Sequence, residues 1–127
     1  MLSISNTTKA KLPRLAFSML KKITDEILGS NYELSLAIVS AVHMKKLNST
    51  HRGIEKTTDI LSFPLSKTDG EMYICLSETK KESLKFDRTY ENFLLFLFIH
   101  GCVHLKGFDH SSTMERIEAQ FRKRFKI

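Results

Sequence analysis

The stretch that most constrains the fold of this chain is a run of seven apolar residues, Phe93 to Ile99, followed directly by His100. Such a run is too unbroken for an exposed amphipathic helix and far shorter than the ~20 residues that span a membrane. It therefore predicts a buried helix. Gly107 stands where this helix should end, because glycine adopts the left-handed conformation of a helix terminus without a steric penalty.

Three of the five histidines lie in or just after this predicted helix. Residues four apart are neighbours on one helix face, so His100 and His104 can bind one ion together. A turn after Gly107 can bring His110 beside them, which leaves the fourth position of a zinc-type ion to water. We therefore predict a catalytic metal site with one ion on His100, His104 and His110. The alternative is three ordinary histidines with no common role.

The spacing of the remaining histidines and of the two cysteines does not connect them to this cluster. We expect His43 and His51 at the surface. Cys75 and Cys102 are too far apart in sequence for a CxxC zinc motif, and Cys102 lies about 200° round the helix from His100. We expect two buried thiols in a reducing compartment.

Charge is unevenly distributed along the 127 residues, whose net charge is +6. The first 24 residues contain five basic side chains and no acidic one, and the last six contain four basic side chains. This excess favours a polyanionic partner, nucleic acid or an anionic membrane surface, although a merely soluble basic protein is the alternative. The length predicts one domain over residues 1–127. The polar start lacks the apolar core of a secretion signal, so we expect a cytoplasmic location.

Apolar periodicity predicts a small sheet covered by helices. We expect a helix ending near Gly29, strands over 34–39, 59–65 and 71–76, and a short helix over 42–50. Polar residues 51–56 should form a loop and residues 67–70 a turn, and no strand is expected before the first helix. Hydroxyl side chains that can cap the later helices stand at Ser77, Thr89, Ser111, Ser112 and Thr113. This order predicts an α/β or α+β layered domain.

A metal ion on three imidazoles acidifies its bound water and polarises carbonyl or phosphoryl oxygens, so hydrolysis is the expected reaction class. Zinc peptidases of the HExxH type carry a glutamate directly after the first histidine as general base. Gly101 occupies that position here. A peptidase would need Asp109 or Glu71 as a replacement, so this function ranks low. Asp109 can instead support a metal-bound histidine or cap the last helix.

Phosphodiester hydrolysis requires a Lewis acid and a cation that holds phosphate. Arg52 is the candidate cation, because it precedes a glycine in the loop before the strand at 59–65 and a guanidinium binds phosphate through two hydrogen bonds. An unpaired surface arginine is the alternative.

Four segments together resemble the YbeY family of bacterial endoribonucleases. The stretch from His100 to His110, HGCVHLKGFDH, resembles that family's HGxLHLxGYDH signature. Arg52-Gly53, the TDILSFP segment at 58–64 and the GEMYIC segment at 70–75 resemble its RG, TDVLSFP and GDIVIC segments in the same order. The similarity covers about Leu34 to Glu118, most of the chain.

The resemblance implies zinc on His100, His104 and His110, a small mixed sheet of about three or four strands, and a buried HxxxH helix. It also implies metal-assisted cleavage of single-stranded RNA in ribosomal RNA maturation, with RNA and ribosomal particles as partners. We assign catalysis to Arg52 and His104. The block from Arg52 to Pro64 then supplies a candidate substrate wall, and its substrate contacts are Arg52, Ser62 and Phe63.

This sequence departs from the family pattern at three positions and at its ends. Thr57 replaces proline, Glu71 replaces aspartate and Phe108 replaces tyrosine. Both ends are short, which leaves little room for an initial strand. Two other functions compete with the endoribonuclease: a ribosome-associated assembly factor with a mainly structural zinc, and a metal-dependent hydrolase of peptides or other substrates.

Overall fold

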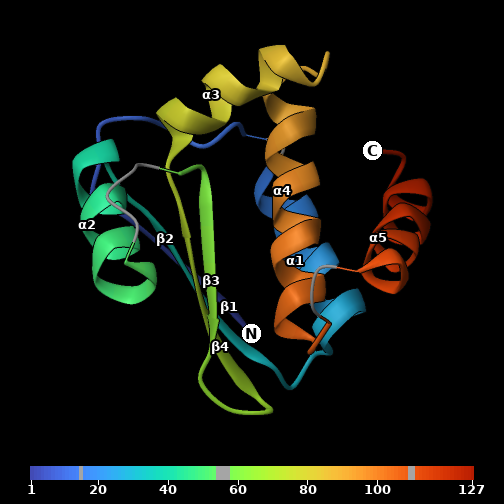
Figure 1. Cartoon of the computed structure of the whole chain (residues 1–127). Helices are drawn as coiled ribbons and strands as arrows, with labels where there is room; N and C mark the ends of the chain where they lie inside the picture. The colour runs from blue at the N-terminus through green and yellow to red at the C-terminus, as the bar shows by residue number, and fades with distance from the viewer. Residues whose placement is uncertain (15, 54–57, 109–110) are drawn as a thin grey trace.

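The computed structural model describes residues 1–14, 16–53, 58–108 and 111–127 (Figure 1). Four strands and five helices follow one another along the chain: β1 (Leu2–Asn6), α1 (Ala16–Leu28), β2 (Glu33–Ile38), α2 (Ala41–Arg52), β3 (Ile60–Pro64), β4 (Asp69–Ile74), α3 (Leu76–Lys85), α4 (Tyr90–Leu105) and α5 (Ser112–Phe125). The strands form one sheet in the order β1-β2-β4-β3, in which β3 is antiparallel to β4 and the other pairs are parallel. The predicted α/β class and its small mixed sheet are confirmed.

The strand β1 is a correction to the sequence prediction, which placed no strand before the first helix. Leu2 pairs with Leu34 and Ile4 with Leu36, and both β1 side chains pack partly buried against the core. The alternation of Leu2 and Ile4 with Ser3 is a strand pattern. It is too short to stand out in a polar segment, because β1 obtains its stability from hydrogen bonding to β2.

The helix α4 lies at the centre of the helical layer, as the apolar run predicts. It packs against α1, α3, α5 and β3, and most of its side chains from Phe93 to Leu105 are buried (Figure 1). Thr89 caps its first turn, because its hydroxyl accepts a hydrogen bond from the amide of Asn92 at 3.1 Å. Gly107 follows its end with a φ of 112°, which confirms the predicted glycine stop.

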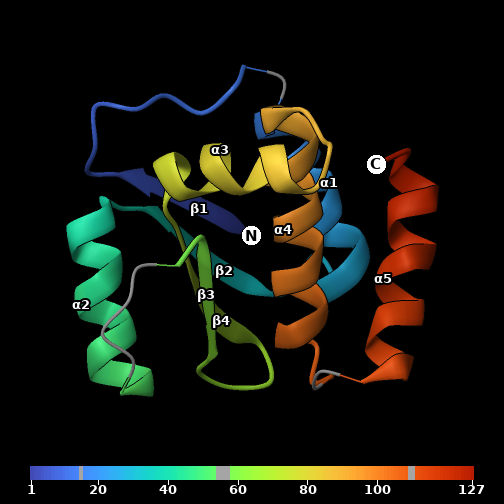
Figure 2. The same ribbon diagram turned by 45° about the horizontal axis from the view of Figure 1, so that its top comes forward.

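The two faces of the sheet are covered unequally (Figure 2). Even-numbered residues of β2 and β4, such as Leu36 and Met72, face α1, α4 and α5 and form the large core. Odd-numbered residues face α2, where a smaller cluster forms around Met44 and Leu61. The strand β3 contributes to both clusters, because Ile60 packs against the large core whereas Leu61 and Phe63 belong to the smaller cluster.

Several predicted boundaries are shifted in the structure. Ser77 does not cap α3: Cys75 occupies the cap position and, within the described chain, makes no capping side-chain hydrogen bond. The helix α2 continues to Arg52 and ends at Gly53, whose φ of 67° favours glycine, so His51 and Arg52 belong to the helix and not to a loop. Ser111, one of the three proposed caps, does cap α5.

The strand β4 begins at Asp69, two residues before the predicted start, because Asp69 and Gly70 pair with Glu33 and Leu34. The first helix begins at Ala16 and ends at Leu28, next to Gly29 as predicted. None of the helices in the described ranges combines the length with the apolar character that a bilayer-spanning helix requires.

Candidate active site

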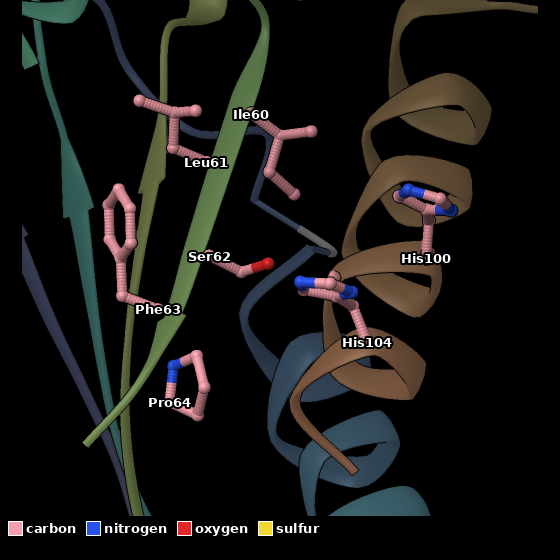
Figure 3. Close-up of a pocket in the computed structure, with 8 residues that line it drawn as sticks. Ile60, Leu61, Ser62, Phe63, Pro64, His100 and His104 are labelled. Atoms are coloured by element: carbon pink, nitrogen blue, oxygen red, sulfur yellow. The ribbon is translucent and has the colours of Figure 1, made fainter. Parts of the chain in front are cut away.

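A cleft of about 430 Å³ lies between β3 and α4 (Figure 3). Its lining comes from the substrate wall and the metal helix that the sequence predicts: Ile60, Leu61, Ser62, Phe63, Pro64, His100, Gly101 and His104. Two of the three predicted metal ligands therefore face the predicted substrate segment. The third, His110, lies outside the described residues, as does Asp109.

His100 is oriented by a carboxylate from the last helix. Its Nδ1 lies 2.8 Å from Oε1 of Glu118 on α5. Because a carboxylate accepts and cannot donate, Nδ1 carries the hydrogen in this contact, and the lone pair of a neutral ring is then on Nε2. The hydrogen bond with Glu118 raises the pKa of His100 above its ordinary value, although burial acts in the opposite direction.

His104 is oriented by the chain that follows its own helix. Its Nδ1 lies 3.2 Å from the carbonyl oxygen of Phe108. The carbonyl can only accept, so this ring also carries its hydrogen on Nδ1 and presents Nε2 as the ligand nitrogen. In Figure 3 the ring extends from α4 toward Ser62 on β3.

This arrangement fits a zinc ion. Neutral imidazole nitrogens suit zinc, and zinc-bound histidines usually donate their second ring hydrogen to a carboxylate or a backbone carbonyl. His100 and His104 show one case of each. The described residues contain no group of three or more His, Cys, Asp or Glu side chains placed to hold an ion, and His110 is not among them.

Glu118 is a site residue that the sequence prediction did not single out. It is 4% exposed, and Nη1 of Arg122 lies 3.9 Å from its Oε1. A carboxylate so deeply buried is costly unless it is paired or hydrogen-bonded, and here its partners are His100 and Arg122. The sequence does contain a sign of this burial, because Glu118 lies on the apolar face of the last helix, one turn after Met114.

Asp59 is a second acidic residue near the histidines that the prediction left unassigned. Burial raises the pKa of its carboxyl above the ordinary value, and the interaction with His100 partly opposes that rise. The reciprocal interaction contributes to the raised pKa of His100. His100 therefore lies in an acidic environment formed by Glu118 and Asp59.

Gly101 allows α4 to lie close to the sheet. A Cβ at this position would be 2.6 Å from Cε of Met72 and 3.0 Å from Cδ1 of Ile60. At the position that carries the general base in HExxH peptidases, a larger side chain would therefore have to displace the ends of the Met72 and Ile60 side chains. This crowding agrees with the low rank given to a peptidase.

The two proposed substrate contacts on β3 point to opposite sides of the strand. Ser62 is directed toward His104, whereas Phe63 projects to the far side of β3 (Figure 3). The ring of Phe63 lies 4.7 Å from that of His51 on α2. His51 is exposed, as predicted, but this contact connects it to the rim of the cleft.

The remaining predicted residues are Arg52 and Glu71. Arg52 is the last residue of α2, and its side chain is outside the described part of the chain. Glu71 is on the sheet face opposite the histidines, where its Oε2 accepts a 2.6 Å hydrogen bond from the hydroxyl of Tyr73. This bond raises the pKa of Tyr73 to about 12. Glu71 therefore does not join the cleft of His100 and His104 as a replacement base.

Both cysteines are buried free thiols, as predicted. Burial raises the pKa of Cys102 far above its ordinary value. Cys102 belongs to the large core and not to the cleft, so the thiol is not a ligand.

Comparison with known proteins identifies one family. Residues 3–126 match the model of the family described as Endoribonuclease YbeY. A protein of that name from Sulfurimonas denitrificans is 33% identical over 123 residues, covering 90% of this chain and 88% of the relative. Another from Mycoplasmopsis synoviae is 37% identical over 115 residues, covering 83% and 71%. A solution structure of a Thermotoga maritima protein, 29% identical, superposes with a TM-score of 0.67 over 95% of this chain and 86% of that one.

Proposed function

This chain belongs to the YbeY endoribonuclease family, and from that premise we propose that it is a zinc-dependent endoribonuclease specific for single-stranded RNA. The observation that supports the metal is the paired orientation of His100 and His104. Both rings place Nδ1 on an oxygen acceptor and leave Nε2 as the ligand nitrogen beside one cleft. His110 completes the proposed ligand set.

The chemistry divides between the two walls of the cleft. A zinc ion bound by the three histidines would supply a Lewis acid and a water of lowered pKa. On the strand side, Ser62 donates its hydroxyl hydrogen to a phosphate oxygen and positions the scissile group opposite His104. Arg52 binds the same phosphate and offsets the negative charge that develops on it.

We further propose that the natural substrate is ribosomal RNA and that the protein acts on ribosomal particles in the cytoplasm. The net charge of +6 supports a polyanionic substrate of this kind. The relatives are named for endoribonuclease activity, and their names support the RNA substrate class.

The test uses the purified protein and a double variant, His100→Ala with His104→Ala. We expect the wild type to contain about one zinc per chain and to cut single-stranded RNA, and the variant to lose both properties. Identical RNA products from the two proteins would contradict the proposal. A duplex of the same sequence serves as control and should remain intact.

The assembly factor with a structural zinc is the second candidate, because the proposed ligands connect α4 to the segment that leads into α5. Metal removal separates the two functions. A structural ion predicts that a chelator unfolds the protein, whereas a catalytic ion predicts a folded and inactive one. Circular dichroism measured alongside RNA cleavage distinguishes these outcomes, and we expect the folded, inactive protein.

A further inference from the structure

The outer edge of β3, the last strand in the sheet order, separates the histidine cleft from an aromatic pair, and the two lie on opposite faces of this strand. We propose that a single RNA strand crosses this edge, with one phosphate at His104 and Ser62 and the adjoining base stacked on His51 and Phe63. The inference rests on the proposed function and adds to it a base-binding site that explains a preference for unpaired RNA.

The backbone of β3 offers hydrogen-bonding groups at this edge. β3 is the last strand of the sheet order, and the described residues place no further strand beside it. The carbonyl of Asp59 accepts from Cys75 and the amide of Leu65 donates to Asp69, both at 3.0 Å. Hydrogen-bonded pairs alternate along an antiparallel ladder, so the amide of Ser62 points away from β4. An anion at the edge thus meets the amide of Ser62 and, from the cleft side, its hydroxyl.

The aromatic pair lies directly across the strand from Ser62. The rings of His51 and Phe63 are 4.7 Å apart with 44° between their planes, and Tyr73 contacts Phe63 edge-on at 6.0 Å. The hydrogen bond from Tyr73 to Glu71 holds that second ring in place. His51 is exposed and Phe63 half-buried, so part of the pair faces solvent. A base stacks on aromatic rings whatever its identity, because every base has a π face.

The charge of α2 favours a nucleic acid as the occupant. The twelve residues of this helix include no acidic one. Its lysine and arginine residues are Lys45, Lys46 and Arg52. Lys45 and Lys46 are exposed, form no ion pair with any described residue, and line a shallow hollow of about 360 Å³. Phosphates beyond the stacked base therefore meet unneutralised cations on the helix that carries His51.

The geometry also selects against a duplex. For the RNA to occupy both faces of β3, one base must unstack from its neighbours in the RNA and pass over the edge of the protein strand. A base in an A-form helix is paired and stacked, whereas an unpaired base reaches an aromatic surface at little cost. The aromatic pair therefore favours single strands without reading their sequence.

The experiment measures binding separately from cleavage. Fluorescence anisotropy with a labelled hexa-adenylate gives the affinity, and the same oligomer with one base removed at each position in turn gives the contribution of each base. We expect His51→Ala and Phe63→Leu to weaken binding by about 5- to 150-fold and to abolish the difference between intact and abasic oligomers. His51→Phe should retain both, because it keeps a ring.

Matched controls are available on the same elements. His43→Ala removes an exposed histidine from α2, and Phe17→Leu removes an aromatic ring that is 54% exposed on α1. Neither should change the affinity. Circular dichroism tests whether Phe63→Leu is folded. Because His51 is exposed, His51→Ala is the variant whose substitution should disturb the fold least.

Two outcomes separate this inference from the proposed function. If the wild type cuts RNA but both ring variants bind and cut as the wild type does, the base-binding site is wrong and the nuclease stands. If the wild type binds the oligomer through these rings but cuts no RNA under any metal condition, the nuclease is wrong. Equal binding of intact and abasic oligomers to the wild type also overturns the base-binding site.

Discussion

The two walls of the cleft are held in place very differently. On the helical wall, His100 and His104 each have one ring nitrogen fixed by an oxygen acceptor, and Gly101 between them lies against the sheet. On the strand wall, Ser62 lies on an edge strand and Phe63 is held by ring contacts with an exposed histidine.

This difference fits the two binding tasks that we propose for the cleft. An ion requires donors fixed within a few tenths of an ångström, and hydrogen bonds from buried acceptors provide this precision. A flexible polymer requires an open rim with hydrogen-bond donors and flat apolar surfaces. The comparison predicts that substitutions on the helical wall alter metal binding, whereas those on the strand and α2 side alter RNA handling with the metal retained.

The largest effect is expected from Arg52→Ala. A lost charge-assisted hydrogen bond to phosphate should lower kcat/KM for single-stranded RNA by about 10- to 150-fold, with zinc content unchanged. Initial rates and metal analysis of the same preparation provide the measurement. Loss of zinc in this variant would give Arg52 a structural role and would break the division between the walls.

Glu118→Gln should have the next largest effect, on the other wall. Loss of the carboxylate that orients His100 should weaken zinc binding by about 10- to 100-fold, as measured by competition with a chromogenic chelator. Glu115→Gln is the matched control, since Glu115 is one turn earlier on α5 and its side chain is 69% exposed. If the variant folds stably and its zinc affinity is unchanged, the contact between Glu118 and His100 contributes to packing and not to metal binding.

Ser62→Ala tests the polar group of the strand wall that faces His104. One neutral hydrogen bond to phosphate predicts a fall in kcat/KM of about 2- to 10-fold with zinc affinity unchanged. Ser35→Ala, on the opposite face of the sheet, should leave the rate unaltered. A rate equal to that of the wild type would remove Ser62 from the substrate contacts.

The smallest effect at a single salt concentration is expected from Lys45→Gln combined with Lys46→Gln. If each lysine meets one phosphate of single-stranded RNA, the slope of log affinity against log salt should become shallower by about 1.4. Titrations between low and physiological salt measure this slope. The control pair Lys21→Gln and Lys22→Gln on α1 carries the same charge change, and an identical response would assign the effect to net charge alone.

Sequence analysis could predict the parts of the site that depend on the spacing of residues close together in the chain. The apolar run with Thr89 before it and Gly107 after it predicted α4 and both of its ends. The interval between His100 and His104 predicted that the two side chains share a face. Ser77 shows the limit of such local rules, because the polypeptide was already helical at Leu76 and the hydroxyl fell inside the first turn.

The parts that were missed depend on partners distant in sequence. β1 becomes a strand through pairing with β2, more than 30 residues away, and its own residues are mostly polar. Glu118 reaches His100 across 18 positions, and His51 reaches Phe63 only because α2 packs beside β3. No periodicity in one segment encodes which other segment will lie against it.

The sequence by itself determined a buried helix with two histidines on one face, a small sheet, a basic surface charge and the segments shared with one family. Only the tertiary structure decided which oxygens orient those histidines and which side of β3 each proposed substrate contact faces. The physical reason is that helix periodicity acts over a few residues, whereas a carboxylate on α5 or a ring on α2 is positioned by the packing of the whole core.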